Sequence, residues 1–154
     1  MPGPVSFTIE RMDARQVERM HELLDLFARA FEDPEHYSSA RPSREYFVRL
    51  LEDDGFFALH ARKEGETIGG LVAYELRKFE QERSEVYIYD LAVDEAHRRQ
   101  GVATGLIEAL KPLAAARGAH VIYVQADYVD PPAIALYTKL GVREDVLHFD
   151  IPVI

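Results

Sequence analysis

Apolar residues along the chain recur at helical spacing in some stretches and alternate in others, which predicts a mixture of helices and strands. From Ala14 to Glu32 the apolar positions return every three or four residues, as in an amphipathic helix. Ser43 precedes a shorter apolar pattern and predicts a second helix that it caps and that stops near Gly55. The prolines and short polar residues of 33–42 predict an exposed loop between the two helices.

Short runs rich in β-branched and aromatic residues predict strands in the first half of the chain. A charged turn at 63–66 separates two of these runs, so we expect an antiparallel meander. Gly69 and Gly70 lie inside one strand and indicate either a bulge or a close contact of the backbone. The expected strands lie within residues 1–13, 56–62, 67–76 and 86–93.

The second half of the chain alternates between the two patterns. Helical spacing begins after Gly101 and should end by Gly118, with Pro112 interrupting it late. Asp130 and Pro131 are a helix cap and a first helical residue, which predicts a further helix. A buried strand is expected at 119–126 and a final strand at 142–151. These elements predict one α/β domain, residues 1–154, built around a single sheet.

Composition narrows the class of protein. With 154 residues, 47% of them hydrophobic and 29% charged, the chain is long enough for one full core. It has no apolar run long enough to cross a membrane and no basic-then-apolar leader, so we expect a cytoplasmic protein without a membrane partner. The absence of cysteine excludes disulfides, thiolate metal sites and a cysteine nucleophile.

The formal net charge of −9 argues against a nucleic-acid partner. It is compatible with a cationic partner, although net acidity is also a common means of keeping a protein soluble. The six histidines do not have metal-ligand spacing with the carboxylates, so no metal is expected.

The stretch from Glu85 to Leu110 predicts a strand, then a basic turn containing Gly101, then a helix. The first backbone N–H groups of a helix lack partners, and the helix dipole favours negative charge there, so the turn is a candidate phosphate site. An ordinary exposed basic turn is the alternative. The turn lacks the glycine patterns of dinucleotide folds and of phosphate-binding loops, which disfavours hydride and phosphoryl transfer.

Two spaced motifs make the prediction more specific. The pattern Arg98-x-x-Gly101-x-Ala103 is followed, one strand later, by Ala133-x-x-x-Tyr137-x-x-x-Gly141. Together they resemble the GNAT superfamily of acetyl-coenzyme A (acetyl-CoA) dependent N-acetyltransferases. The resemblance implies an α/β (α+β) fold with a single mixed, mostly antiparallel, splayed sheet and flanking helices.

A closer resemblance runs through most of the chain. FEQERSE, EVYIYDLAV, HRRQG, VIYVQADY, ALYTKLGVRE and HFDI look like the aminoglycoside 3-N-acetyltransferases that inactivate gentamicin-type antibiotics. This resemblance implies a cationic aminoglycoside substrate, acetyl-CoA as cosubstrate and a homodimer.

The resemblance also assigns residues to the cofactor. Backbone amides of the glycine turn would hold the pyrophosphate, and a bulge in the fourth strand would expose backbone groups for the pantetheine arm. The implied cofactor-binding residues are Leu91, Ala92, Val93, Arg98, Arg99, Gln100, Gly101, Val102, Ala103, Thr104, Ala133 and Tyr137. Tyr137 would protonate the leaving thiolate; read without the motif, it is an ordinary core tyrosine of an amphipathic helix.

Acyl transfer to an amine requires a neutral nitrogen, so a base must remove the ammonium proton. Asp90 is the first candidate, because the bulge should turn it into the cleft, where partial burial would raise its pKa and strengthen it as a base. Its alternative role is to cap the amides of the bulge. Asp127 is the second candidate, as base or as ammonium ligand. The candidate substrate-binding residues are Tyr37, Glu80, Glu85, Asp90, Asp127 and Asp150.

The favoured hypothesis is direct acetyl transfer from acetyl-CoA to the 3-amino group of an aminoglycoside, without an acyl-enzyme. Two rivals remain open. One is a related enzyme that acetylates another polyamine or a protein amine, and the other is a catalytically silent module that binds coenzyme A.

Overall fold

The computed structural model of the chain describes residues 6–154, so residues 1–5 of the expected first strand lie outside the described residues. The chain divides into two compact units, one ending at Val124 and one comprising Gln125–Ile154. The single-domain organisation expected from the sequence stays a prediction.

The first unit contains one five-stranded sheet in the order β1-β2-β3-β4-β5. The first four strands pair antiparallel with their neighbours, and β5 pairs parallel with β4. The expected meander and the mixed, mostly antiparallel sheet are therefore confirmed. The strands are β1 (Thr8–Arg11), β2 (Phe56–Lys63), β3 (Glu66–Arg77), β4 (Ser84–Val93) and β5 (Ala119–Val124).

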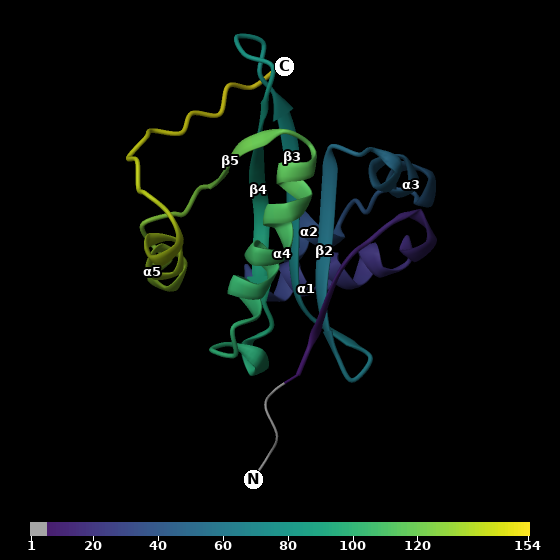
Figure 1. Cartoon of the computed structure of the whole chain (residues 1–154). Helices are drawn as coiled ribbons and strands as arrows, with labels where there is room; N and C mark the ends of the chain where they lie inside the picture. The colour runs from purple at the N-terminus through teal and green to yellow at the C-terminus, as the bar shows by residue number, and fades with distance from the viewer. Residues whose placement is uncertain (1–5) are drawn as a thin grey trace. The chain divides into compact units, whose positions relative to one another are not determined.

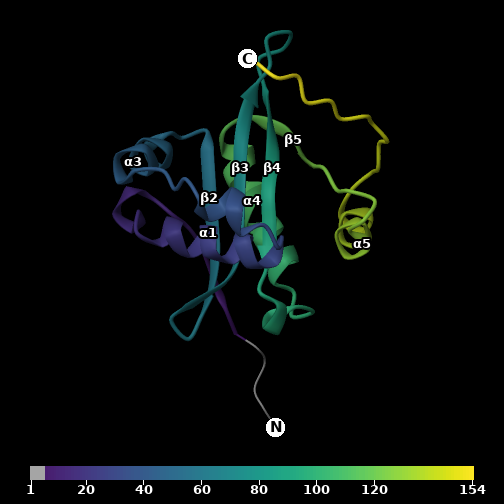
Figure 2. The same ribbon diagram turned by 180° about the vertical axis from the view of Figure 1, so that it is seen from behind.

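Helices cover both faces of this sheet (Figures 1 and 2). Helices α1 (Arg19–Ala30) and α2 (Pro34–Ser38) lie on one face, and α4 (Val102–Ala116) lies on the other. Helix α3 (Arg44–Glu52) contacts β2 and begins at Ser43, whose Oγ accepts a hydrogen bond from the Tyr46 amide at 3.2 Å, as the sequence predicted.

The two glycines of β3 let helices approach both faces closely. A Cβ atom on Gly70 would collide with Leu23 of α1, and one on Gly69 would lie 2.7 Å from Val102 Cγ1 of α4. Real Cβ atoms do not approach other atoms so closely, so only glycine fits without a shift of the Leu23 and Val102 side chains. Both readings of this glycine pair are confirmed, because the helices pack closely on it and the register of β3 with β2 shifts beside Gly69, where Ile68 is an extra residue.

The amphipathic helix expected at 14–32 forms as α1 with shorter bounds, and the loop expected after it is partly helical. The stretch from Ala14 to Glu32 is divided into a 3-10 turn, η1 (Ala14–Gln16), and α1, because Asp13 and Gln16 form a capping box around the turn. The expected loop at 33–42 contains α2, which starts with Asp33 as cap and Pro34 in the first position. That is the same start signal that correctly predicted the later helix at Asp130.

Helix α4 corrects a further expectation, since it continues through Pro112 to Ala116 without interruption. Pro112 is exposed, and its ring is accommodated on the solvent side of the helix. The strand expected at 119–126 forms as β5 over Ala119–Val124, but its residues are half-buried or exposed rather than buried, because β5 is the edge strand of the sheet.

In the first unit, the 3-10 turn η2 (Glu95–His97) lies between β4 and α4. The second unit contains α5 (Pro131–Leu140). Asp130 Oδ1 accepts a hydrogen bond from the Ala133 amide at 3.2 Å, which confirms the predicted cap. The strand expected at 142–151 is absent, and residues 142–154 form neither helix nor strand. Alternation alone does not make a strand, because a strand requires a paired neighbour.

Candidate functional site

Strand β4 contains a bulge at Tyr89. Asp90 lies opposite Val72 of β3, whereas Ile88 lies opposite the very next residue, Ala73. Tyr89 is therefore an extra residue in β4, and one extra residue reverses the faces to which the neighbouring side chains point. The bulge that the family resemblance implied is present.

The bulge places Asp90 on the face of the sheet that carries α1 and α2. Val72, its partner on β3, packs in the same buried cluster as Leu23 and Phe27 of α1. Ile88, on the other side of the bulge, is 2% exposed and belongs to the opposite face. If β4 paired regularly with β3 through Tyr89, Asp90 and Ile88 would share one face.

Asp90 forms one long-range hydrogen bond, which it accepts at Oδ1 from the Tyr37 hydroxyl at 3.0 Å. Burial raises the pKa of the Asp90 carboxyl above its ordinary value; the Tyr37 hydrogen bond and the nearby His36 oppose this rise. The same contact and burial raise the pKa of Tyr37, so its hydroxyl stays protonated. Of the two roles weighed for Asp90, capping of the bulge amides has no hydrogen bond in its support here.

Helix α2 holds Tyr37 in a cage of rings. Its ring centroid lies 5.9 Å from that of Phe27, 5.7 Å from that of Phe31 and 4.8 Å from that of His36. Aromatic contacts at these separations favour one side-chain position. The short helix missed by the sequence analysis is thus the element that brings Tyr37 to Asp90.

A row of tyrosines continues from this point along the same face. Tyr89 lies edge-on to both Tyr74 and Tyr87, with ring centroids 5.9 Å apart in each pair. Tyr87 stacks flat on Tyr123 of β5 at 4.6 Å. Tyr89 is 56% exposed, so the row offers aromatic surface beside Asp90.

Strand β4 is unpaired on one side beyond the bulge. Its pairing with β5 ends at Ile88, and no strand among residues 6–154 continues along that edge. The Asp94 amide donates to the Ile68 carbonyl on the β3 side. Because backbone groups alternate along a strand, those of Leu91 and Val93 point away from β3, toward the unpaired edge.

The glycine turn begins α4 without a side-chain cap. Gly101, at the N-cap, has φ +79°, and Arg99 also has a positive φ of 63°. The space beside Gly101 is open to 4 Å, and no acidic residue lies in the first turn of the helix. The amides of Val102, Ala103 and Thr104 therefore stand at the positive end of a 15-residue helix with no side chain bound to them. This arrangement fits an anion such as a pyrophosphate.

The other residues of the turn divide into two kinds. Arg98 and Arg99 are exposed, and Arg98 Nε lies 3.4 Å from the Val93 carbonyl at the unpaired edge. Gln100 is partly buried, and its Oε1 atom has no hydrogen-bond partner. The turn and the free edge of β4 are thus adjacent.

Two of the expected substrate carboxylates are already paired. Lys78 Nζ lies 3.0 Å from Glu80 and 3.3 Å from Glu85, and His120 lies 3.5 Å from Glu85. A hydrogen bond with its own backbone amide, followed by the Lys78 contact, lowers the pKa of the Glu80 carboxyl. Both carboxylates therefore share a cation of the protein itself, Lys78.

The second unit carries Tyr137, Ala133, Asp127 and Asp150. Burial, and then the charge of Asp130, raises the pKa of Tyr137 to about 12. Asp127 is exposed, and its backbone carbonyl accepts the Asp130 amide at 3.0 Å. Asp150 lies in the irregular tail, 2.8 Å from His148.

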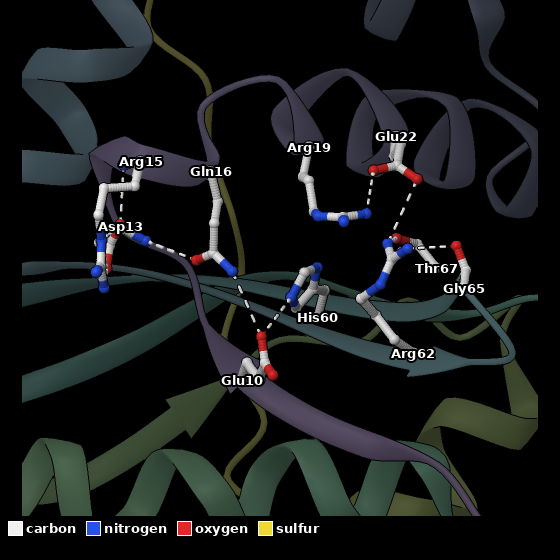
Figure 3. A network of polar contacts seen from close by, with 10 residues as sticks. All are labelled: Glu10, Asp13, Arg15, Gln16, Arg19, Glu22, His60, Arg62, Gly65 and Thr67. Carbon is white, nitrogen blue, oxygen red and sulfur yellow. Dashed lines mark hydrogen bonds and ion pairs between the residues drawn. The ribbon is translucent and has the colours of Figure 1, made fainter.

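A separate polar cluster surrounds His60 of β2 (Figure 3). His60 is fully buried, and its Nε2 lies 3.6 Å from Glu10 Oε2, beyond hydrogen-bond distance. Arg62 contacts Thr67 at 2.8 Å and also the Gly65 carbonyl. Within residues 6–154, no group of three or more His, Asp or Glu side chains is arranged to hold a metal.

The sequence analysis did not single out the tyrosine row or His36. The alternation Tyr87-x-Tyr89 in VYIYD was a usable signal, since two tyrosines precede the candidate base. Their position beside Asp90 depends on the bulge, and the bulge was predicted only through the family resemblance.

In the described part of the chain, no helix has the length and apolar character needed to cross a membrane.

Comparisons with known proteins agree with this geometry. The chain is 61% identical to an aminoglycoside acetyltransferase from an uncultured soil metagenomic sample, with a TM-score of 0.94 over 97% of this chain and 99% of that one. It is 32% identical to a second such enzyme from an uncultured soil sample, solved in complex with sisomicin, with a TM-score of 0.87 over 96% of each chain.

A more distant relative is an N-alpha-acetyltransferase from Sulfurisphaera tokodaii, 27% identical over 106 residues. The aligned part spans 64% of this chain and 64% of that enzyme. The model of the acetyltransferase (GNAT) family, whose members use acetyl-CoA, matches residues 19–142. The fold, the splayed sheet and the uncapped glycine turn agree with that match, and the chain belongs to the GNAT acetyltransferase family.

Proposed function

We propose that this chain transfers the acetyl group of acetyl-CoA directly to an amine of an aminoglycoside in a ternary complex. The observation that carries the proposal is the half-buried Asp90 carboxylate, turned by a bulge to one face of β4 just before the unpaired edge at Leu91 and Val93. The 61% identity with an aminoglycoside acetyltransferase supports the substrate class.

The residues present fit coenzyme A in two places. Amides at the start of α4, with Gly101 and the flanking Arg98 and Arg99, suit the pyrophosphate. The outward backbone groups of Leu91 and Val93 suit the amides of the pantetheine arm, which would extend the sheet along its free edge. Acetyl-CoA bound in this way supplies an acyl group activated as a thioester.

Asp90 is proposed as the base that takes the ammonium proton of the substrate. The freed lone pair attacks the thioester carbonyl carbon, and the carbon–sulfur bond then breaks. A carboxylate that only attracted the ammonium would raise the amine pKa and oppose the attack, whereas a carboxylate with a raised pKa accepts the proton more readily. The absence of cysteine agrees with direct transfer.

Tyr137 is proposed as the acid that protonates the departing thiolate. The assignment rests on its match to the second family motif, and its raised pKa of about 12 keeps the hydroxyl protonated at neutral pH. Ala133, in the same motif, is proposed to contact the cofactor.

The substrate amines would be bound by Glu80, Glu85, Asp127 and Asp150, with Asp127 retained as the alternative base. Because Lys78 already pairs with Glu80 and Glu85, a polycation must compete with it, and binding should weaken steeply with ionic strength. The finer proposals are gentamicin-type substrates, the 3-amino group as acceptor and a homodimer.

The deciding experiment measures thiol release by the purified protein with acetyl-CoA and gentamicin, sisomicin, spermidine or a lysine peptide at equal concentration. Preference for the aminoglycosides is expected, and NMR of the product identifies the acetylated nitrogen. Absence of thiol release above background with both antibiotics would refute the proposal. Sedimentation of the protein tests the dimer separately.

The distant likeness to an N-alpha-acetyltransferase favours one rival, acetylation of a protein or peptide amine. Preference for the lysine peptide or for a peptide with a free N-terminus would support it. Coenzyme A binding without turnover on any amine would support a silent binding module.

A further inference from the structure

The half-buried tyrosine of α2 has its hydroxyl directed at the candidate base rather than at open solvent. The Tyr37 hydroxyl is 3.0 Å from Asp90 Oδ1, across 53 positions of sequence. A hydroxyl can donate one hydrogen bond, and the Tyr37 hydroxyl donates it to the Asp90 carboxylate. Tyr37 is therefore poorly suited to donate to a substrate hydroxyl, although the sequence placed it among substrate-binding residues.

We infer that Tyr37 is a positioning residue, which fixes the direction of the Asp90 carboxylate and keeps it ionised for proton abstraction. The inference rests on the proposed function of Asp90 as the base. It adds a second element, α2, to a reaction centre otherwise assigned to β4.

The packing of Tyr37 suits this role. Its ring is held by Phe27 of α1 and by Phe31, which directly follows α1, and it lies edge-on to its neighbour His36. A carboxylate at a bulge is otherwise free to turn about its χ angles, so a donor fixed in a ring cage selects one orientation. The remaining oxygen of Asp90 is then the one available to the ammonium.

The charge balance around Asp90 points the same way. Burial favours the neutral acid, and a hydrogen bond donated to the carboxylate favours the charged form, so Tyr37 acts against burial. Few titratable groups lie close enough to Asp90 to influence its charge. Those that face Asp90 are His36 and Tyr37 of α2, Tyr74 of β3, and Tyr87 and Tyr89 of β4 itself, while Asp33 acts on Tyr37.

His36 is the one group in that set that can carry a positive charge. Its effect on Asp90 is electrostatic and is ranked below the hydrogen bond from Tyr37. Its effect on the pKa of Asp90 has the same sign as that of the hydrogen bond from Tyr37. Burial raises the pKa values of Tyr37, Tyr74 and Tyr87, so these hydroxyls stay neutral near pH 7 and do not alter the sign.

The test compares Tyr37→Phe with Tyr46→Phe, a control on α3 whose ring is 49% exposed. Phenylalanine keeps the ring contacts of Tyr37 and removes only the donor. In Tyr37→Phe the acid limb of kcat/KM should move to higher pH, so that activity on that limb falls about tenfold, as expected for loss of a hydrogen bond to a charged group. The KM for acetyl-CoA should be unchanged, and Tyr46→Phe should match the wild type.

A ¹³C NMR titration of the Asp90 carboxyl, assigned with Asp90→Asn, gives a readout that needs no turnover. It should report a higher pKa in Tyr37→Phe than in the wild type. An unchanged Asp90 titration would overturn the inference even if the enzyme is active, whereas failure of the wild type to acetylate any aminoglycoside would overturn the proposed function and leave the coupling measurable. In the Asp90→Asn background, Tyr37→Phe should cause no further loss of activity; an additional loss would indicate a merely structural role.

Discussion

Ile88 and Asp90 are two positions apart on one strand and yet point to opposite faces of the sheet. Ile88 faces the core under α4, and Asp90 faces α1 and α2 beside Tyr37. In a regular strand, residues two apart share a face. The single extra residue, Tyr89, converts a position of the buried core into a place for a titratable carboxylate.

This placement predicts that Asp90 has a cost in stability. Burial raises its pKa in the folded state above the unfolded value, so the stability linked to Asp90 is present below the unfolded pKa of about 3.9 and is lost as the pH rises through the folded value. Asp90→Asn should lower the rate of acetyl transfer by about 100-fold or more, because the proposed base is lost, and yet raise Tm at pH 7.5 by about 2 to 4 °C.

Calorimetric scans at pH 7.5 and pH 4 check this, with the exposed Asp54→Asn as control. The gain should shrink at pH 4, because the Asp90 carboxyl is then about half protonated in the unfolded state and more than half protonated in the folded state. A lower Tm for Asp90→Asn than for the wild type at neutral pH would contradict the predicted destabilisation by the buried Asp90 carboxylate.

The glycine turn permits a matched comparison within one helix. Gly101 at the start of α4 and Gly118 after its end both have positive φ, +79° and +86°, and open space where a Cβ would stand. Alanine at either position should cost about 1 kcal/mol of folding free energy through backbone strain. Only Gly101→Ala should also weaken coenzyme A binding, by about tenfold or more, because its methyl group enters the place assigned to the pyrophosphate.

Titration calorimetry measures the affinity of each variant for coenzyme A, and thermal unfolding measures the loss of stability in Gly101→Ala and Gly118→Ala. Equal affinities in the two variants would mean that the turn at Gly101 is not the pyrophosphate site.

Tyr137 should contribute to turnover and little to binding. Tyr137→Phe removes the proposed acid and should lower kcat by about 100-fold, the usual size of a general-acid contribution, with coenzyme A affinity nearly unchanged. Because the Tyr137 pKa is raised to about 12, the wild-type rate should not fall through its deprotonation below about pH 11.

Steady-state kinetics against Tyr128→Phe, an exposed tyrosine of the same unit, provides the comparison. A wild-type rate in Tyr137→Phe would exclude the hydroxyl as the acid.

The sequence predicted elements well wherever local signals and packing agree. Ser43 and Asp130 cap helices as expected, because a side-chain oxygen and the amides of the next turn are all that a cap requires. Asp33 carried the same signal, and α2 was missed because its five residues are too few to build a helical stripe. The prediction of a strand at 142–151 was wrong because a strand must pair with residues that are distant in the sequence, and alternation does not reveal them.

The residues of the candidate site show the same difference between local signals and contacts of distant segments. The glycine turn is local, and its motif located it correctly at the start of α4. The contact between Tyr37 and Asp90 joins two segments 53 residues apart and depends on the bulge, so no spacing in the sequence could reveal it. The paired state of Glu80 and Glu85 likewise required knowledge of where Lys78 lies.

His60 predicts how the fold responds to acid. It is fully buried, neither ring nitrogen has a hydrogen-bond partner, and burial lowers its pKa, with Arg62 and Arg19 adding to this and Glu10 opposing it. A histidine with a lowered folded pKa stabilises the protein above its unfolded pKa of about 6.5, and this stability is lost as the pH falls through the folded value. His60→Leu should therefore make Tm less sensitive to acid between pH 7.5 and pH 5.

Thermal unfolding across that range, with His148→Leu as control, measures the effect, because the His148 side chain is 64% exposed and its substitution should leave the slope of Tm against pH unchanged. The slope in His60→Leu should be smaller than in the wild type, since the unfolded chain then takes up one proton fewer. A steeper slope in His60→Leu than in the wild type would mean that His60 is protonated in the fold, with Glu10, 3.6 Å away, as its counter-ion. That result would assign the acid sensitivity to carboxylates whose pKa is lowered in the fold, such as Glu80, and not to Asp90, whose pKa is raised.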